Sequence, residues 1–186
     1  MVHIKSLTPK EFSAHYKLLI ADADGTLRRC IVAGQPCPNQ ANESVTIQEA
    51  KPLLSLWNSH KFGIASNQGG VGLGYLSGTA AWSMRANLAV ELIHDFNVSL
   101  HLVQICGSID KADPDRKPNP GMLHRVMLAP HSSPDQTLMV GDRDDDRLAA
   151  KAAGCDFIWA WDLFGFERSI EKTHFYSTAP EPTELW

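Results

Sequence analysis

Five short apolar runs recur along the chain, each bounded by polar residues or glycine, and they constrain the fold more than any other feature. They cover residues 16–21, 62–65, 101–106, 137–140 and 156–160. Their length and their content of β-branched residues are typical of buried strands. Helical patterns lie between them, and strands that alternate with helices predict a parallel sheet with helices on both faces. We therefore expect an α/β, Rossmann-like fold.

Four helices are expected between these strands. Pro52 is expected to begin one that ends near His60, and Asn119-Pro120 is typical of the start of another. Gly154 is expected to end a third, over residues 146–153. The longest carries an apolar stripe at 3.6-residue spacing, which predicts a buried face formed by Trp82, Ala86, Ala89, Leu92, Ile93 and Phe96.

Two stretches lie outside this alternation. The pattern from Thr8 to Glu11 is typical of a capping box with proline at the first helical position, which predicts a short helix. Residues 28–50 fit neither period and are expected to be a loop near the active site. The whole chain, residues 1–186 with 44% apolar residues, is long enough for one well-packed core and is expected to form a single domain.

Polar side chains follow three of the predicted strands directly. Asp22, Ser66 and Asp142 each stand where an apolar run ends. In open α/β sheets, ligands bind at the carboxyl ends of the strands. We therefore expect these residues to meet at one edge of the sheet.

The most informative stretch is residues 22–27, DADGTL, which follows the apolar run directly. Two carboxylates one residue apart can take separate roles in phosphoryl transfer. Asp22 or Asp24 can attack phosphorus, while the other protonates the leaving oxygen and later deprotonates water. Mg²⁺ would relieve the repulsion between the two acids. The alternative is a surface turn rich in Asp and Gly, which the preceding apolar run disfavours.

Two further stretches carry groups that can bind phosphate. The hydroxyl of Ser66 and the amide of Asn67 precede a glycine-rich segment, whose backbone N–H groups can approach a phosphate closely. A flexible connection is the alternative explanation of the glycines. Lys117, fixed ahead of Pro118, can place its ammonium against a phosphoryl oxygen and the nucleophile. Taken alone, it would be a solvated surface lysine.

Four aspartates follow the run at 137–140. Mg²⁺ usually takes one or two carboxylates and keeps several waters. Asp142, at the strand end, is the best candidate ligand, and Asp146 is expected to support the site from behind the metal ligands. Asp144 and Asp145 are better explained as favourable charges at a helix N-terminus.

Together these four stretches resemble the motifs of the haloacid dehalogenase superfamily of phosphohydrolases. DADGTL is similar to its DxDGT motif, the serine of SNQ to its second motif, Lys117 to its third and GDRDDD to its GDxxxD motif. They occur in the family's order, over residues 17–161. The segments SNQGG and RKPNPGM resemble most the branch that contains histidinol-phosphate phosphatase, D-glycero-D-manno-heptose bisphosphate phosphatase and polynucleotide 3′-phosphatase domains.

The resemblance implies a role for each matched residue. The nucleophile is Asp22 and the general acid/base is Asp24. The groups that bind the phosphoryl group or lie close to the substrate are Ser66, Asn67, Arg116 and Lys117. The magnesium ligands are the Asp22 carboxylate, the Asp24 backbone carbonyl and Asp142. The resemblance also implies minimal capping elements and therefore a fairly open active site.

One departure from the branch concerns zinc. Several of its phosphatases carry a zinc loop of three cysteines and a histidine just before the KPxPGM segment. Here residues 106–116 contain one cysteine, Cys106, and no histidine. A closed structural zinc site needs four such ligands, so we expect Mg²⁺ as the cofactor and no zinc.

The leading hypothesis is a magnesium-dependent phosphomonoesterase that acts on a small phosphorylated metabolite, such as a sugar or amino-alcohol phosphate, through an aspartyl-phosphate. A polynucleotide 3′-phosphatase is the alternative with the same chemistry. The formal net charge of −4 and the lack of a basic stretch interleaved with aromatic residues disfavour it. The cations around the expected site are Arg28, Arg29, Arg116, Lys117, Arg143 and Arg147.

An alternative of another class is a catalytically silent binding module on the same scaffold. The presence of both motif aspartates, the lysine and Asp142 argues against it. The sequence begins without the apolar run of a signal peptide, contains no stretch of ~18 apolar residues and has no CxxC pair. We expect a monomeric cytoplasmic protein with no membrane partner.

Overall fold

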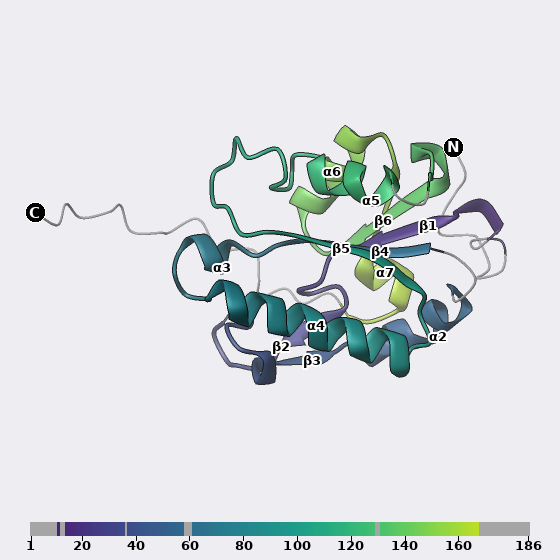
Figure 1. The fold of residues 1–186 in the computed structure, drawn as a ribbon. Helices are drawn as coiled ribbons and strands as arrows, with labels where there is room; N and C mark the ends of the chain where they lie inside the picture. The colour runs from purple at the N-terminus through teal and green to yellow at the C-terminus, as the bar shows by residue number, and fades with distance from the viewer. Residues whose placement is uncertain (1–10, 12–13, 36, 58–60, 129–130, 168–186) are drawn as a thin grey trace, which may run out of the picture.

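A parallel sheet of five strands forms the centre of the molecule (Figure 1). The computed structural model describes residues 11, 14–35, 37–57, 61–128 and 131–167. The strands are β1 (Leu18–Ala21), β4 (Lys61–Asn67), β5 (Leu100–Cys106), β6 (Thr137–Gly141) and β7 (Asp156–Trp159). They lie in the order β5-β4-β1-β6-β7, and every neighbouring pair is parallel. Each predicted apolar run corresponds to one strand, which confirms the α/β fold.

Helices cover both faces of this sheet, as predicted. The α-helices after β1 are α2 (Lys51–Leu54), α3 (Gly69–Gly72), α4 (Gly78–His94), α5 (Gly121–Leu128), α6 (Asp144–Ala153) and α7 (Ala160–Phe164). Short 3-10 turns occupy residues Ala41–Glu43, Gln48–Ala50, Ser55–Trp57 and Pro134–Gln136. No helix among the described residues is long and apolar enough to cross a membrane.

Alternation along β1 divides the core into two layers. Leu18 and Ile20 pack in the apolar cluster that includes α5 and α6. Leu19 and Ala21 point to the opposite face, into the cluster that includes α2, α4 and α7. Figure 1 shows α5 and α6 on one side of the sheet and α4 on the other. Because β1 is buried on both faces, its sequence is apolar throughout.

Most helix boundaries differ from the predictions by one or two residues. Gly154 ends α6 in the left-handed conformation, with φ 76°, as predicted. The helix expected from Pro52 begins at Lys51 and continues as the 3-10 turn at Ser55–Trp57, and residues 58–60 lie outside the described part. Most of the helix expected at Thr8 also lies outside it, and of this segment residues 11 and 14–15 are described and helical.

The predicted buried face of α4 was largely wrong. The buried residues are Ala81, Met84, Leu88 and Leu92, and the stripe is therefore rotated by about one residue. Trp82 and Ile93 are 60% and 47% exposed, and only Leu92 and Phe96 of the predicted set are buried. Apolar residues occur on more than one side of this helix, so spacing alone admits two stripes. Contact with the sheet decides between them.

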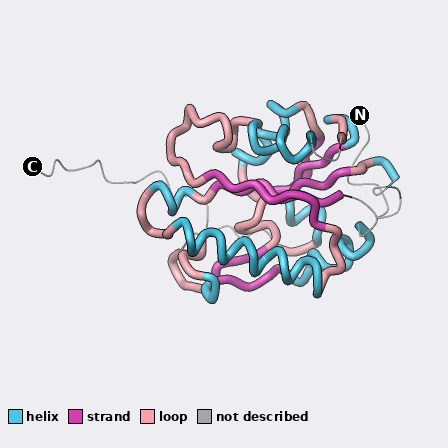
Figure 2. The backbone as a smooth tube through the Cα atoms, in the orientation of Figure 1, coloured by secondary structure: helices cyan, strands magenta, loops and turns pink. Residues whose placement is uncertain are grey.

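The loop predicted over residues 28–50 was also wrong in part. Residues Arg28–Cys30 form β2 and residues Ser44–Thr46 form β3, which pair as an antiparallel ribbon. Figures 1 and 2 show this ribbon beside α4, apart from the main sheet. The Thr46 hydroxyl donates to the Glu91 carboxylate of α4. Strands of three largely polar residues have no detectable period, so the sequence could not reveal them.

Candidate active site

The order of the strands positions the predicted site. Asp22 follows β1 in the middle of the sheet, and its backbone N–H donates to the carbonyl of Val140, 3.0 Å away in β6. Ser66 and Asn67 are the last residues of β4, the neighbour on the other side. Asp142 follows β6, and Asp146 lies in the first turn of α6. The predicted convergence at the carboxyl edge of the sheet is therefore observed.

The buried ammonium of Lys117 is the centre of this site. The side chain of Lys117 is 2% exposed. Its Nζ lies 2.7 Å from Asp22 Oδ1, 2.6 Å from Asp146 Oδ1 and 2.6 Å from the carbonyl oxygen of Ala65. An ammonium has three N–H donors, so each of them has an acceptor. Among the described residues, none donates a hydrogen bond to the second carboxylate oxygen of Asp22.

The charges in this cluster perturb one another. Burial disfavours the ammonium of Lys117, but the carboxylates of Asp146 and Asp22 outweigh burial and raise the pKa of Lys117. Burial raises the pKa of Asp22 to about 6, with Asp146 and Asp24 adding to the effect and Lys117 opposing it. Two carboxylates share one ammonium, so the cluster retains negative charge that a further cation would neutralise.

An acidic cluster that could hold such a cation lies at the same place. Single oxygens of Asp22, Asp142 and Asp146 lie within 4.8 Å of one another. Both oxygens of Asp146 are already engaged, one by Lys117 and the other by the backbone N–H of Arg143 at 3.0 Å. Asp22 and Asp142 are therefore better placed to bind a metal, with Asp146 holding Lys117. An all-oxygen set of this kind fits Mg²⁺.

Gly25 allows the DADGT turn to approach Asp142. Its φ of +92° is unfavourable for other residues, and a Cβ atom there would lie 2.1 Å from Asp142 Oδ2. Gly141 has a similar role, because a Cβ at that position would lie 2.4 Å from Asp146 Oδ2. The close packing of the acidic residues thus depends on two glycines in the matched motifs.

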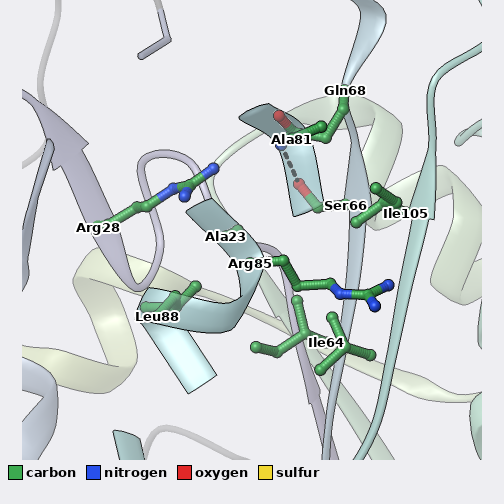
Figure 3. A pocket seen from close by; sticks show the side chains of 10 residues that line it. Ala23, Arg28, Ile64, Ser66, Gln68, Ala81, Arg85, Leu88 and Ile105 are labelled. Atoms are coloured by element: carbon green, nitrogen blue, oxygen red, sulfur yellow. Dashed lines mark hydrogen bonds between the residues drawn. The ribbon is translucent and has the colours of Figure 1, made fainter. Parts of the chain in front are cut away.

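Asp24 is held from two sides, by Arg28, which was predicted only as one of the cations around the site, and by Gln68, which was not predicted. Arg28 Nε donates to Asp24 Oδ1 at 2.7 Å, and Arg28 Nη2 donates to Oδ2 at 3.3 Å. Gln68 Nε2 donates to the same Oδ2 at 2.8 Å. It also donates to Ser66 Oγ at 3.1 Å, as Figure 3 shows. The SNQ motif could have indicated Gln68. No sequence signal indicates the contact between Arg28 and Asp24, because residues 24–28 do not form a helix.

Asn67 binds the backbone of Lys117. Its Oδ1 accepts from the Lys117 N–H at 3.0 Å, and its Nδ2 donates to the Lys117 carbonyl at 2.9 Å. The side chain thus fixes the segment that carries the lysine, and its closeness to substrate stays a prediction. Arg116 donates through Nη1 to the carbonyl of Ser108 at 2.6 Å. Nη1 of Arg116 also lies 3.5 Å from the place that a Cβ of Gly69 would occupy.

Comparison with known proteins gives a consistent result. A family model described as HAD-hydrolase-like matches residues 115–160. The chain is 29% identical over 171 residues to a D-glycero-β-D-manno-heptose-1,7-bisphosphate 7-phosphatase from Mesorhizobium japonicum, which covers 87% of this chain and 76% of the relative. A solved structure described as a HAD-like phosphatase from Mesorhizobium loti matches with a TM-score of 0.64 at 26% identity, over 76% of this chain and 70% of the other. The chain belongs to the haloacid dehalogenase superfamily of phosphatases.

The fold of this phosphatase also matches a second solved member. The D,D-heptose 1,7-bisphosphate phosphatase of B. bronchiseptica, complexed with magnesium and phosphate, has a TM-score of 0.66 at 20% identity. That match covers 76% of this chain and 78% of the other. The predicted family is therefore confirmed by sequence and by fold.

The loop before Lys117 is held in the phosphatase by hydrogen bonds. Asn119 Nδ2 donates to the carbonyls of Lys111 and Asp113, at 2.9 and 2.8 Å. The Gly121 N–H donates to the carbonyl of Pro114 at 2.9 Å. Cys106 at the start of the loop is a buried free thiol. These contacts occupy the region in which relatives of the branch place a zinc loop, and they give it a fixed shape.

A narrow pocket adjoins the Asp24 side of the site (Figure 3). It lies between β4 and β5 on one side and α4 on the other. Arg28, Ser66 and Gln68 form its polar wall, and Leu88 and Ile105 contribute apolar atoms. The pocket therefore connects the groups that hold Asp24 with the face of α4 that packs on the sheet.

The raised pKa of Asp22 makes the stability of the metal-free phosphatase depend on pH. An unfolded aspartate has a pKa of about 4, whereas burial raises the pKa of folded Asp22 to about 6. Between these values the folded state binds more protons, so the free energy of unfolding falls by about 3 kcal/mol as pH rises. We expect Asp22→Asn to remove this part of the pH dependence in urea unfolding with EDTA.

Asp135→Asn is the matched control, because Asp135 is exposed in the turn at Pro134–Gln136. It should keep the wild-type pH dependence. A wild-type stability that rises from pH 4 to pH 6 relative to that of Asp22→Asn would contradict the assignment.

Proposed function

We propose that this phosphatase hydrolyses a small sugar phosphate in two steps, with Asp22 as the nucleophile and Asp24 as the general acid/base. The observation that carries the proposal is the contact of Lys117 with Asp22, 2.7 Å long and buried beside Asp142 and Asp146. This contact fixes one carboxylate oxygen of Asp22 and leaves the second oxygen available to attack an incoming phosphate. The residues that would hold Mg²⁺ are Asp22, Asp142 and the backbone carbonyl of Asp24.

The first step transfers the phosphoryl group to the protein. The second oxygen of Asp22 attacks phosphorus, the bond from phosphorus to the leaving oxygen breaks, and that oxygen takes a proton from the carboxyl group of Asp24. Lys117 remains on the first oxygen of Asp22 and balances its charge. A bound Mg²⁺ would supply positive charge that reduces repulsion between the carboxylates and the phosphate.

The second step releases phosphate. Water attacks phosphorus, its proton passes to Asp24, and the bond between phosphorus and Asp22 breaks with its electrons returning to the carboxylate. Ser66 Oγ accepts a hydrogen bond from Gln68, so its own O–H is left to donate to a phosphate oxygen. Arg116, one residue before Lys117, is the second candidate for binding the substrate.

The state of the nearby cations favours a small substrate over a nucleic-acid end. Arg28 is paired with Asp24, Arg29 with Glu49 at 3.1 Å, and Arg147 with Asp144 at 3.1 Å. Cations dominate affinity for nucleic acid because they neutralise successive phosphates. Arginines that are already paired with carboxylates contribute little to this affinity. The relative from Mesorhizobium japonicum is named for a sugar bisphosphate, which supports a sugar phosphate here.

The nucleophile is tested by Asp22→Asn. The amide is a poor nucleophile of nearly the same size, so we expect kcat with p-nitrophenyl phosphate to fall far more than tenfold while the far-UV spectrum stays unchanged. Asp135→Asn should keep the wild-type kcat. If the Asp22 variant retains more than about a tenth of the wild-type kcat, its activation free energy has risen by less than ~1.4 kcal/mol. That result would contradict the assignment of the nucleophile.

The metal is tested by chelation and by Asp142→Ala. We expect EDTA to abolish activity and added Mg²⁺ to restore it, and Asp142→Ala to need at least about tenfold more Mg²⁺ for half-maximal rate. The free energy of unfolding of this variant should change little or rise, because repulsion among the acids is relieved. Elemental analysis should find no stoichiometric zinc. Full turnover in excess EDTA is the contrary result.

The substrate class is tested by comparing kcat/KM for a panel of small sugar phosphates with that for a 3′-phosphorylated oligonucleotide, at two salt concentrations. We expect the sugar phosphates to be preferred at both, because few cations are left to bind a strand. A preference for the oligonucleotide that collapses at high salt would favour the polynucleotide 3′-phosphatase. Hydrolysis of neither class would favour a silent binding module.

A further inference from the structure

Arg28 is buried against the acid/base aspartate although it lies outside all four matched motifs. The residue is 5% exposed, and the charged part of its side chain makes two contacts with Asp24, at 2.7 and 3.3 Å. Its Nη1 donates to the carbonyl of Met84 in α4 at 3.4 Å. A guanidinium buried in this way is costly unless it is paired, so the position has a specific partner in Asp24.

We propose that Arg28 is a positioning residue, which fixes the direction of the Asp24 carboxylate for proton transfer. The inference rests on the proposed function, because it assigns a task to Arg28 within the two steps of phosphate-ester hydrolysis. Arg28 itself touches neither the phosphate nor the nucleophile in the proposed reaction.

The direction of Asp24 is fixed because its oxygens accept from two different elements. Arg28, the first residue of β2, contacts both oxygens, and Gln68, just after β4, contacts Oδ2 at 2.8 Å. A planar guanidinium that binds both oxygens of a carboxylate determines the orientation of the carboxylate plane as well as its position. In Figure 3 the guanidinium of Arg28 points from the ribbon toward the side on which Gln68 lies.

Arg28 is itself held by the ribbon and by α4. It pairs with Thr46 across β2 and β3, and Thr46 contacts Glu91 of α4. The contact with the Met84 carbonyl adds a second link to the same helix. The direction of the acid/base carboxylate therefore depends in part on the ribbon and on α4, which carry none of the motif residues.

The same carboxylate must serve both steps, and this makes its direction matter to the rate. In the first step it gives its proton to the leaving oxygen as the bond to phosphorus breaks. In the second it takes a proton from the attacking water as the bond to Asp22 breaks. Misplacing such a group by about 1 Å slows proton transfer without weakening the binding of phosphate.

A double-mutant cycle with p-nitrophenyl phosphate tests the inference. We expect Arg28→Gln to lower kcat about 10- to 100-fold, the usual loss when the partner of a functional group is removed, with KM changed less than about threefold. Asp24→Asn should lower kcat by about 10²- to 10⁴-fold. In the Asp24→Asn background, Arg28→Gln should add less than about a threefold loss, because its target is no longer able to transfer a proton.

Two further variants keep the test interpretable. Arg29→Gln changes the next residue, an exposed arginine paired with Glu49, and should keep kcat within about twofold of the wild type. Arg28→Lys retains the buried charge but not the planar contact, and should lie between the wild type and Arg28→Gln. If Arg28→Gln fails to fold by far-UV circular dichroism, Arg28→Lys takes its place in the cycle.

The outcomes separate this inference from the proposed function. A wild-type enzyme that hydrolyses no phosphate ester would overturn both. If the wild type is active and Arg28→Gln or Arg28→Lys lowers kcat by the same factor in the wild-type and Asp24→Asn backgrounds, the inference alone is overturned. The inference is also overturned if kcat is unchanged in both variants, or if the variants raise KM without lowering kcat.

Discussion

The site depends on one buried ammonium shared by two carboxylates. Lys117 bridges Asp22 after β1 and Asp146 in α6, and it also binds the carbonyl of Ala65 in β4. Three elements of the sheet edge thus meet at a single nitrogen. Removing one partner of such a buried group would leave the charge of the other partner uncompensated. The glycines at positions 25 and 141 are consequences of this arrangement, because the acids can approach only where the neighbouring backbone lacks a Cβ.

Around this centre the residues fall into two groups with different tasks. Asn67 and Asp146 hold Lys117, and Arg28 and Gln68 hold Asp24. Neither group needs to contact the substrate in order to affect the reaction. Residues that orient a catalytic side chain commonly matter nearly as much as the side chain itself. In the proposed reaction, the chemistry therefore depends on the ribbon and on the loop before α5 as well as on the strand ends.

The sequence was sufficient for the five strands because buried parallel strands are apolar on both faces and appear as continuous runs. It was also sufficient for the meeting of Asp22, Ser66 and Asp142, since the strand ends of a parallel sheet meet at one edge. Lys117 was indicated only by its resemblance to the family's third motif. It could not decide which side of α4 faces the sheet, because Trp82 and Met84 are both apolar and only packing distinguishes them. The contact between Arg28 and Asp24 was likewise hidden, because it depends on a ribbon of two very short strands.

The separation of the partners along the chain has a consequence for folding. Lys117 lies 95 residues from Asp22, Asn67 lies 50 from Lys117, and Gln68 lies 44 from Asp24. Closing such long loops costs entropy that only a largely assembled sheet can offset. A partly folded chain therefore contains the same acids without their partners, as ordinary solvated aspartates. The appearance of activity during refolding would mark the completion of the sheet, and not the formation of any single helix or strand.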